Sequence, residues 1–374
     1  MIAAASIKIE KTARIENKTN AFRYPIHQRS VQKVGRAKII RLAAEIKSAP
    51  GGNSENVVKK APAGNNKIAA ILANNCFLFI FDTNNYVKIL LIISRPRFWI
   101  YVLGPYLVGL AAGAKSPDDF LRPDVTIFLF YFLLPANLLI YGINDIFDFE
   151  TDSLNPKKND YEMRLPAEAH SSLIKSILTV NIPFFIIAAL FSPKILAAFC
   201  LFVFLSVFYS SPPIRAKALP LVDSAFNFLY VVPGIVAYIL TSNQSPPADV
   251  LLAAGLWTAA MHAFSAVPDI DSDRRVGLLT VAVFLGRRGT IFFCLLNYSI
   301  SALIMYKYLG GSAIALGSLY ASLMAASIFI NNEKLLFRIY SSFPWINAIA
   351  GFVIFLIAAM KNTALMGFLP FGGL

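Results

Sequence analysis

Charged residues are scarce in this chain. Asp, Glu, Lys and Arg together make up 15% of its 374 residues, whereas a soluble domain carries about 25%. Hydrophobic residues make up 57%. So few charges cannot cover the surface of an ordinary water-soluble domain. The composition therefore excludes that class and indicates an integral membrane protein.

Cysteine and histidine are also rare, with three residues of each. Cys76, Cys200 and Cys294 are far apart in the sequence, which argues against a disulfide framework or a redox pair. No spacing of His and Cys suits a zinc site. The sequence therefore gives no sign of disulfide, redox or zinc chemistry.

Long apolar runs fill the chain from residue 88 onward. Nine of them approach the roughly 20 residues that a helix needs to cross a bilayer. We therefore predict an all-α integral membrane protein, a bundle of nine transmembrane helices within one domain of residues 86–368. The predicted spans are residues 94–114, 124–143, 172–192, 194–212, 221–241, 249–268, 280–307, 311–330 and 343–363.

The first 75 residues form a different kind of segment. Residues 1–70 hold 14 of the 34 Lys and Arg residues but only four acids. They contain no apolar stretch of the kind found in a secretory signal. We expect a basic extension that is disordered or forms a loose surface helix. It could be a solvated tail, a membrane-surface clamp or an organelle-targeting segment. No recognition fold accompanies the charge, so nucleic acid is not an expected partner.

The remaining cations indicate how the bundle is oriented in the membrane. Most of them fall in loops on the side of the amino terminus, and cytoplasmic loops are typically the basic ones. We therefore expect a cytoplasmic amino terminus, a carboxyl terminus outside, and residence in the cell (inner) membrane. The opposite side holds only Lys115, Arg122, Lys194, Lys307 and Lys361.

Two acidic clusters lie where apolar runs end, at residues 144–152 and 269–273. With helical periodicity, Asn144, Asp148 and Asp152 fall at positions i, i+4 and i+8 on one stripe, with Asp145 beside it. Asp269 and Asp273 repeat the i, i+4 spacing. Both clusters fall on the predicted cytoplasmic face, where the two stripes could face each other. Carboxylates that meet a substrate phosphate form the kind of site that Mg²⁺ prefers.

Basic and aromatic residues accompany the acids, and a metal-bridged diphosphate needs this mixture. We predict that the metal ligands are Asp145, Asp148, Asp152, Asp269 and Asp273, and that Asp145, Asp148, Asp269 and Asp273 are the catalytic residues. Glu150 and Asp271 point away from the stripes and are expected to be solvated. The predicted substrate-binding residues are Asn144, Arg95, Lys158, Arg164, Tyr209, Lys217, Arg274 and Tyr141.

Two polar residues lie deeper in the apolar segments. His262 is seven residues before Asp269, on the same helical face and about two turns further into the membrane. It could assist proton removal, contact an acceptor, or be hydrogen-bonded between helices. Asn137 lies within the second predicted span, and polar side chains at such depth usually face a cavity or a partner helix.

Three motifs carry a resemblance to a known family. They are Asn-Asp-x-x-Asp-x-x-x-Asp at 144–152, Tyr-Ser-Ser-Pro-Pro at 209–213 followed by Arg215 and Lys217, and Asp-x-x-x-Asp at 269–273. In this order the chain resembles the UbiA superfamily of membrane prenyltransferases. The resemblance implies a helical bundle with a central cavity, cytoplasmic Asp-rich loops that bind Mg²⁺ and a prenyl diphosphate, and transfer of the prenyl group to a lipophilic acceptor.

The region of the second acidic cluster narrows the resemblance. Residues 261–277, followed by Leu285-Gly286, are similar to the lycopene elongase type, which extends the ends of a carotenoid by a five-carbon unit. The resemblance therefore implies a polyene acceptor such as lycopene and dimethylallyl diphosphate as the donor. Arg164-Leu165-Pro166 departs from the Arg-x-Leu-Pro of quinone-pathway relatives, which puts the role of Arg164 in doubt.

Two alternatives stay open at this point. One is a prenyltransferase for an aromatic acceptor in quinone, haem or chlorophyll synthesis. The other is a membrane transporter, which could also place acids inside a helical bundle. Coupling carboxylates of transporters are expected near the middle of the bilayer, however, and these acids lie at span ends.

Overall fold

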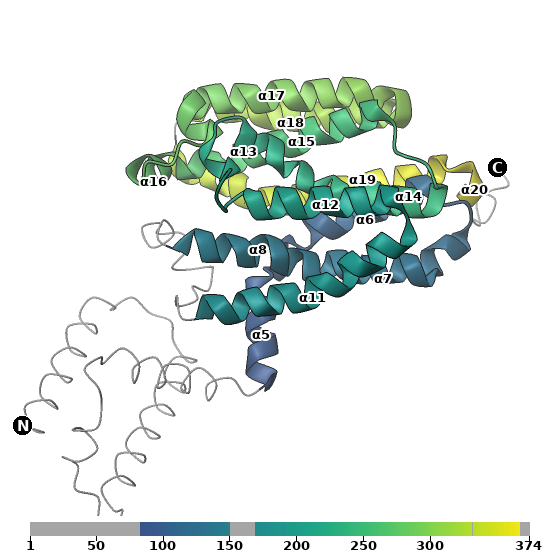
Figure 1. Ribbon diagram of the computed structural model, residues 1–374. Helices are drawn as coiled ribbons and strands as arrows, with labels where there is room; N and C mark the ends of the chain where they lie inside the picture. The colour runs from purple at the N-terminus through teal and green to yellow at the C-terminus, as the bar shows by residue number, and fades with distance from the viewer. Residues whose placement is uncertain (1–82, 150–168, 331, 367–374) are drawn as a thin grey trace, which may run out of the picture. The chain divides into compact units, whose positions relative to one another are not determined.

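The computed structural model describes residues 83–149, 169–330 and 332–366 (Figure 1). Every regular element in these ranges is a helix, as predicted. The α-helices are α5 (Thr83–Ile93), α6 (Ile100–Gly113), α7 (Pro123–Leu133), α8 (Pro135–Phe147), α11 (His170–Phe191), α12 (Pro193–Phe208), α13 (Val222–Ala225), α14 (Val232–Ser242), α15 (Ala248–Ala266), α16 (Ile270–Arg275), α17 (Val281–Leu309), α18 (Gly311–Phe329), α19 (Glu333–Lys361) and α20 (Thr363–Met366). Short 3-10 helices connect some of them: η1 (Pro96–Phe98), η2 (Pro117–Leu121), η4 (Ala216–Ala218), η5 (Phe226–Tyr230) and η6 (Val267–Asp269).

Seven helical segments among the described residues are long and apolar enough to cross a membrane. Each of the nine predicted ranges contains a helix, but α6 has 14 residues and α12 has 16. The count of nine spans therefore stays a prediction, as does the basic extension, which lies outside the described residues. The seven segments are Pro123–Phe147, His170–Phe191, Val222–Ser242, Ala248–Arg275, Val281–Leu309, Gly311–Phe329 and Leu335–Lys361.

Proline and serine set the boundaries of several helices. Ser192 caps α12, because its Oγ accepts a hydrogen bond from the Ile195 N–H at 3.1 Å, and Pro193 starts the helix. This separates α11 from α12 at the predicted boundary between the spans 172–192 and 194–212. The predicted span 124–143 is instead broken at Leu134, whose φ of −120° lies outside the helical range. Pro135 then begins α8, and proline is common at the first position of a helix.

Asn137 lies close to this break. Its side chain is fully buried, and its Nδ2 donates to the carbonyl oxygens of Phe132 and Leu133 at 3.1 and 2.9 Å. Asn137 does not line the cavity described below, and its amide faces the end of the neighbouring helix α7. The carbonyls at the end of α7 lack partners within the helix, and the Asn137 amide satisfies two of them.

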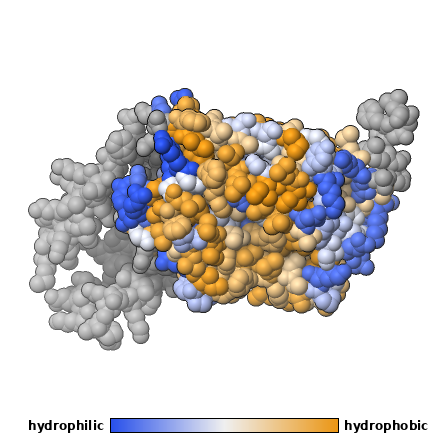
Figure 2. Space-filling view, turned by 90° about the horizontal axis from the view of Figure 1, so that it is seen from above, coloured by the Kyte–Doolittle hydropathy of each residue, from blue (hydrophilic) through white to orange (hydrophobic). Residues whose placement is uncertain are grey.

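The outer surface of the bundle is apolar around its middle. Figure 2 shows hydrophobic residues over the central part of the described helices and hydrophilic residues toward both ends. Leu190, Phe329 and Trp345 are 81%, 81% and 74% exposed. Large apolar side chains exposed in a belt of this kind suit lipid rather than water. The protein is an integral membrane protein.

Helices α6 and α14 approach each other closely inside the bundle. A Cβ atom on Gly109 would overlap the Gly234 carbonyl, and one on Gly234 would lie 2.9 Å from the Pro105 oxygen. Glycine lets two backbones meet at such a crossing, because no side chain separates them. The contact fixes α6, which contributes Tyr101 to the cavity described below.

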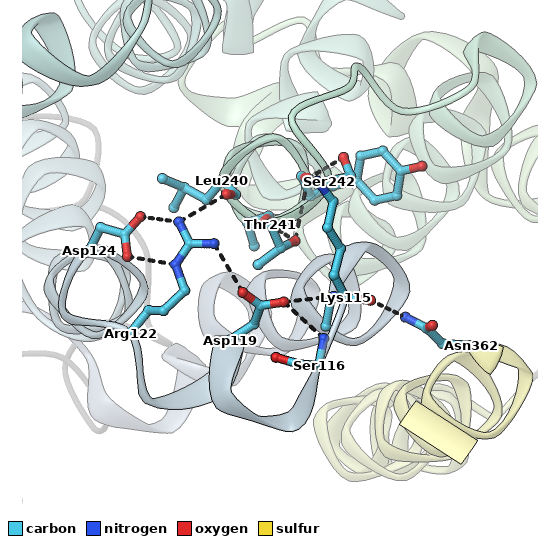
Figure 3. A network of polar contacts seen from close by, with 12 residues as sticks. Lys115, Ser116, Asp119, Arg122, Asp124, Leu240, Thr241, Ser242 and Asn362 are labelled. Carbon is cyan, nitrogen blue, oxygen red and sulfur yellow. Dashed lines mark hydrogen bonds and ion pairs between the residues drawn. The ribbon is translucent and has the colours of Figure 1, made fainter. Parts of the chain in front are cut away.

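A network around Arg122 joins η2 to α14 (Figure 3). The Arg122 guanidinium donates to Asp119 Oδ1 at 3.0 Å, to Asp124 Oδ2 at 2.6 Å and to the Leu240 carbonyl at 3.2 Å. Nearby, the Asn362 amide donates to the carbonyls of Ala111 and Ala114. Figure 1 shows α20 at one end of the bundle and α16 at the other. The network lies beside α20 and therefore at the end of the bundle that is opposite α16.

Candidate active site

The first acidic cluster lies at the carboxyl end of α8. Asp148 caps this helix, and its N–H donates to the Asn144 carbonyl at 2.8 Å, so the helical register continues to Asp148. The Ser210 hydroxyl lies within hydrogen-bonding distance of Asn144 Oδ1, at 3.0 Å, and of Asp148 Oδ2, at 3.2 Å. The predicted stripe therefore brings Asn144 and Asp148 to one point, beside the Tyr-Ser-Ser-Pro-Pro segment.

Two of the predicted cations contact these acids. The Arg95 guanidinium lies 2.7 Å from Asp145 Oδ1, and the Lys217 ammonium group contacts Asp148 Oδ1. Lys217 is 6% exposed and Asp148 is 7% exposed. A buried charge is tolerated only with a partner of opposite charge. Both pairs therefore gather positive and negative groups at the same end of the bundle.

The second acidic cluster spans η6 and α16. Asp269 ends η6, and Asp273 Oδ2 accepts a hydrogen bond from Thr280 Oγ1 at 3.4 Å. Asp271 is solvated as predicted, with its side chain 79% exposed. Arg274 pairs with Asp271 at 3.7 Å and lies at the surface, with its side chain 62% exposed. It contributes nothing to the cavity lining described below. Figure 1 places α16 at the same end of the bundle as the carboxyl end of α8.

Tyr209 lies at the end of α12, next to both Lys217 and His262. Its carbonyl accepts a hydrogen bond from the Lys217 N–H at 3.0 Å, and its hydroxyl lies 3.4 Å from His262 Nε2. Tyr209 therefore links the segment that carries Lys217, the partner of Asp148, to α15, the helix that precedes the second acidic cluster.

A cavity of about 260 Å³ opens beside these residues. Its lining includes the predicted Arg95, Tyr141, Asn144 and Tyr209, and also His262. The cavity therefore has polar and charged groups from the site and an otherwise largely aromatic and aliphatic wall. The remaining lining residues are Phe98, Tyr101, Ile140, Ser206, Asn227, Leu229, Tyr230, Met261, Phe264, Ser265, Tyr340, Phe343, Pro344 and Asn347.

Aromatic rings are held in place along the cavity wall. The Arg95 guanidinium carbon lies 4.8 Å from the centre of the Tyr141 ring, and the hydroxyls of Tyr141 and Tyr230 are 3.4 Å apart. The Tyr101 ring meets the Tyr230 ring edge-on, at 6.1 Å between centroids. The negative faces of such rings attract a cation. The wall can therefore stabilise positive charge that develops in the cavity.

The comparisons with known proteins agree with this geometry. The sequence model described as the UbiA prenyltransferase family matches residues 102–343. A lycopene elongase/hydratase of Haloferax volcanii is 37% identical over 278 residues, which are 73% of this chain and 89% of that protein. One of Haloarcula japonica with the same name is 35% identical over 273 residues, 72% of this chain and 90% of that protein.

The chain belongs to the UbiA prenyltransferase family. It is therefore an enzyme, a prenyltransferase, and the transporter alternative is set aside. A UbiA homologue from Archaeoglobus fulgidus, solved with GPP and Mg²⁺ bound, matches the structure with a TM-score of 0.53. Its sequence is 20% identical, and the match covers 71% of this chain and 99% of that one. At this identity the likeness shows the fold of the family.

The oxygen atoms of the UbiA-family site suit a hard cation. Within the described residues no three His, Cys, Asp or Glu side chains form a ready-made metal cluster. An Asn144 oxygen and an Asp148 oxygen nevertheless both lie within hydrogen-bonding distance of the Ser210 hydroxyl. Mg²⁺ usually takes one or two carboxylates and completes its shell with substrate phosphates and water. The donor set therefore fits Mg²⁺ held together with a diphosphate.

Three predicted site residues, Asp152, Lys158 and Arg164, lie outside the described residues and stay predictions. Other residues of the site were missed by the sequence reasoning. Ser210 belongs to the Tyr-Ser-Ser-Pro-Pro motif at 209–213. That motif could have suggested its contacts with Asn144 and Asp148. Asn347 is a polar residue within the last predicted span, and such residues tend to face cavities. Asp223 gave no comparable signal, because it is a single acid at the start of an apolar segment.

Proposed function

We propose that this enzyme transfers the prenyl group of a prenyl diphosphate, dimethylallyl diphosphate, to a polyene acceptor such as lycopene in a Mg²⁺-dependent reaction of carotenoid synthesis. The observation that carries the proposal is the cavity whose aromatic wall meets Arg95 and Asn144 beside the buried Asp148 and Lys217 pair. The name of the two relatives described above, lycopene elongase/hydratase, supports the polyene acceptor.

The acidic clusters hold the metal in this proposal. Asp145, Asp148 and Asp152 bind it from the first cluster, and Asp269 and Asp273 bind it from the second cluster. Asn144 serves as a further oxygen ligand or contacts the diphosphate. When bound, Mg²⁺ neutralises charge on the diphosphate oxygens and so makes the diphosphate a better leaving group. The buried position of Asp148 supports its role as a metal ligand. A carboxylate that is shielded from water attracts a cation more strongly.

Cations of the chain bind the leaving diphosphate. Arg95 and Lys217 each contact a carboxylate of the first cluster, so both would lie close to a diphosphate bound at that cluster. Lys158, Arg164 and Arg274 are proposed to add positive charge from the loops. Stabilising the charge that develops on a leaving group is usually the largest contribution to such a reaction. These side chains therefore carry most of the proposed catalysis.

The aromatic wall serves the other half of the reaction. As the carbon–oxygen bond of the donor breaks, the prenyl carbon becomes positively charged, and the faces of Tyr141, Tyr101 and Tyr230 can stabilise it. The aromatic and aliphatic wall limits the access of bulk water, which would otherwise consume the cation. An electron-rich double bond at one end of the polyene then attacks the cation. Only that end of the acceptor needs to enter the cavity.

The orientation predicted from the basic loops completes the proposal. The site faces the cytoplasm, the amino terminus is cytoplasmic, the carboxyl terminus is outside, and the protein resides in the cell (inner) membrane. A water-soluble diphosphate made in the cytosol then reaches the acidic clusters directly, and the lipophilic acceptor arrives from the bilayer.

The test is a reaction with purified protein in liposomes. Dimethylallyl diphosphate and longer prenyl diphosphates are each offered with lycopene, 4-hydroxybenzoate or a naphthoate, with and without Mg²⁺, and products are identified by mass spectrometry. We expect prenylated lycopene only when Mg²⁺ is present. Prenylation of the aromatic acids alone would overturn the acceptor, and full turnover after chelation of Mg²⁺ would overturn the role of the metal.

A further inference from the structure

A buried carboxylate, a histidine and a tyrosine meet at one side of the cavity. Asp223, on α13, is fully buried. His262, on α15, lies with its Nε2 3.7 Å from Asp223 Oδ2 and 3.4 Å from the Tyr209 hydroxyl. The three residues come from three separate elements. His262 and Tyr209 both line the cavity.

The carboxylate of Asp223 is held firmly in this arrangement. Its Oδ2 accepts a hydrogen bond from the Val281 N–H at 2.7 Å, and its Oδ1 accepts one from the Ser224 N–H at 2.7 Å. Asp223 therefore presents a carboxylate in a fixed position to His262, the group that would become positive on taking up a proton.

The position of His262 suits proton transfer rather than metal binding or diphosphate binding. It lies on α15 seven residues before Asp269, and its ring meets the Tyr209 ring edge-on at 5.8 Å between centroids. A neutral imidazole has a nitrogen that can accept a proton, and histidine is the side chain that most often serves as a general base. The Tyr209 hydroxyl lies within reach of Nε2 and has a proton that it can pass on.

The proposed reaction needs a proton acceptor that nothing above supplies. When the double bond of the acceptor attacks the prenyl cation, a carbon–carbon bond forms and the positive charge moves to the acceptor. A water molecule can end the reaction by bonding through its oxygen to that carbon. The resulting oxonium ion must then lose one proton, and the relatives' name, elongase/hydratase, includes addition of water.

We infer that His262 is the base that accepts this proton, that Tyr209 relays it, and that Asp223 is a positioning residue that stabilises the protonated histidine. The inference rests on the proposed function. In the step itself, the oxonium proton moves to the Tyr209 oxygen as the Tyr209 proton moves to His262 Nε2. The product is a prenylated tertiary alcohol, and His262 carries the positive charge until the proton leaves to solvent.

The test measures products rather than overall activity. His262→Gln, Tyr209→Phe and wild-type enzyme are given dimethylallyl diphosphate and lycopene in liposomes. Diphosphate release and the ratio of hydrated to unhydrated C5-extended product are followed by chromatography and mass spectrometry. A lost general base typically costs about 10²-fold or more, so we expect that ratio to fall by about 10²-fold in His262→Gln while the KM for the donor stays within about twofold. Tyr209→Phe, which keeps the ring, should lower the ratio less.

Controls separate this inference from the proposed function. His170→Gln makes the same change at the other histidine of the described residues, outside the cavity, and should leave the product ratio unchanged. His262→Ala should form hydrated product again when imidazole is added, because imidazole can replace the missing base. A variant that had lost activity through misfolding would not respond in this way. An unchanged product ratio in His262→Gln, or a wild-type enzyme that extends lycopene without adding water, would overturn the inference. Failure of the wild-type enzyme to extend lycopene would instead refute the proposed function.

Discussion

Lys217 and Asp148 form an ion pair across 69 residues of sequence, and both side chains are buried. The pair ties the segment after α12 to the end of α8. It also places a positive and a negative charge next to the proposed diphosphate position. A charge that loses such a partner stays buried and uncompensated, so the pair is a sensitive point for both stability and activity.

The first prediction concerns this ion pair. Lys217→Met removes the buried cation that pairs with Asp148 and should lower the free energy of unfolding by about 3 kcal/mol. Adding Asp148→Asn removes the carboxylate charge and should restore most of the stability in thermal unfolding experiments in detergent. Prenyl transfer should stay at least about 10²-fold below wild type in both proteins. Recovery of activity in the double variant would show that neither charge acts in catalysis.

The second prediction compares two acids of the second cluster. Asp273→Asn should raise the Mg²⁺ concentration needed for half-maximal activity by at least about tenfold. Metal affinity falls by about this factor even when the lost residue only bonds to a ligand of the metal. Asp271→Asn is the matched control, because this side chain is 79% exposed. Activity is titrated with Mg²⁺ for both variants. Equal shifts in the two titrations would contradict the assignment of Asp273 as a ligand.

The third prediction tests the crossing of α6 and α14. In Gly109→Ala the new methyl group would overlap the Gly234 carbonyl, and such overpacking costs about 1–3 kcal/mol. Gly351→Ala in α19 is the control, since a Cβ there meets no atom within 4 Å. It should leave stability unchanged or raise it by about 0.5–1 kcal/mol. Thermal unfolding in detergent measures both, and equal behaviour of the two variants would contradict the close approach.

The fourth prediction concerns pH and the network in Figure 3. Burial acts to raise the pKa of Asp119, but hydrogen bonds from the Lys115 N–H, Arg122 and the Ser116 N–H outweigh it and hold the pKa below its ordinary value. A lowered folded-state pKa means that the charged carboxylate stabilises the fold above the unfolded-state pKa, about 3.9. This contribution is lost as the pH falls through the folded-state pKa.

Asp119→Asn measures this contribution. At pH 6 to 7, well above the Asp pKa of about 3.9, the variant should unfold at a lower temperature than wild type. The difference between the two proteins should shrink as the pH is lowered below about 4, because the unfolded wild-type chain then takes up a proton at Asp119 and the folded protein follows at lower pH. A difference that stays constant down to pH 2 to 3, below about 3.9, would show that the charge of Asp119 does not stabilise the fold.

Periodic features of the molecule were predictable from the sequence. The apolar runs predicted the helices, and the i, i+4 spacing predicted that Asn144 and Asp148 share a side, because both follow from local helical geometry. The site residues Arg95, Tyr141 and Lys217 were predicted from their motifs and flanking positions. The structure then placed them beside the cavity or the first acidic cluster.

Features that depend on packing between distant segments were not predictable in the same way. Asp223 reaches His262 only because α13 lies against α15, which no spacing within either segment reveals. The bonds of Asn137 to the carbonyls of Phe132 and Leu133 depend instead on the local break before Pro135, which the apolar pattern did not reveal. Neither partner could be read from helical periodicity alone.

The hydroxyl of Ser210 has one hydrogen atom, yet it lies within reach of two acceptors, Asn144 Oδ1 and Asp148 Oδ2. It can donate to only one of them at a time, so the oxygens compete for it. A divalent ion, which attracts both oxygens at once, would end that competition and release the serine. We therefore expect the Ser210 hydroxyl to lose its contacts with these two oxygens when the metal binds.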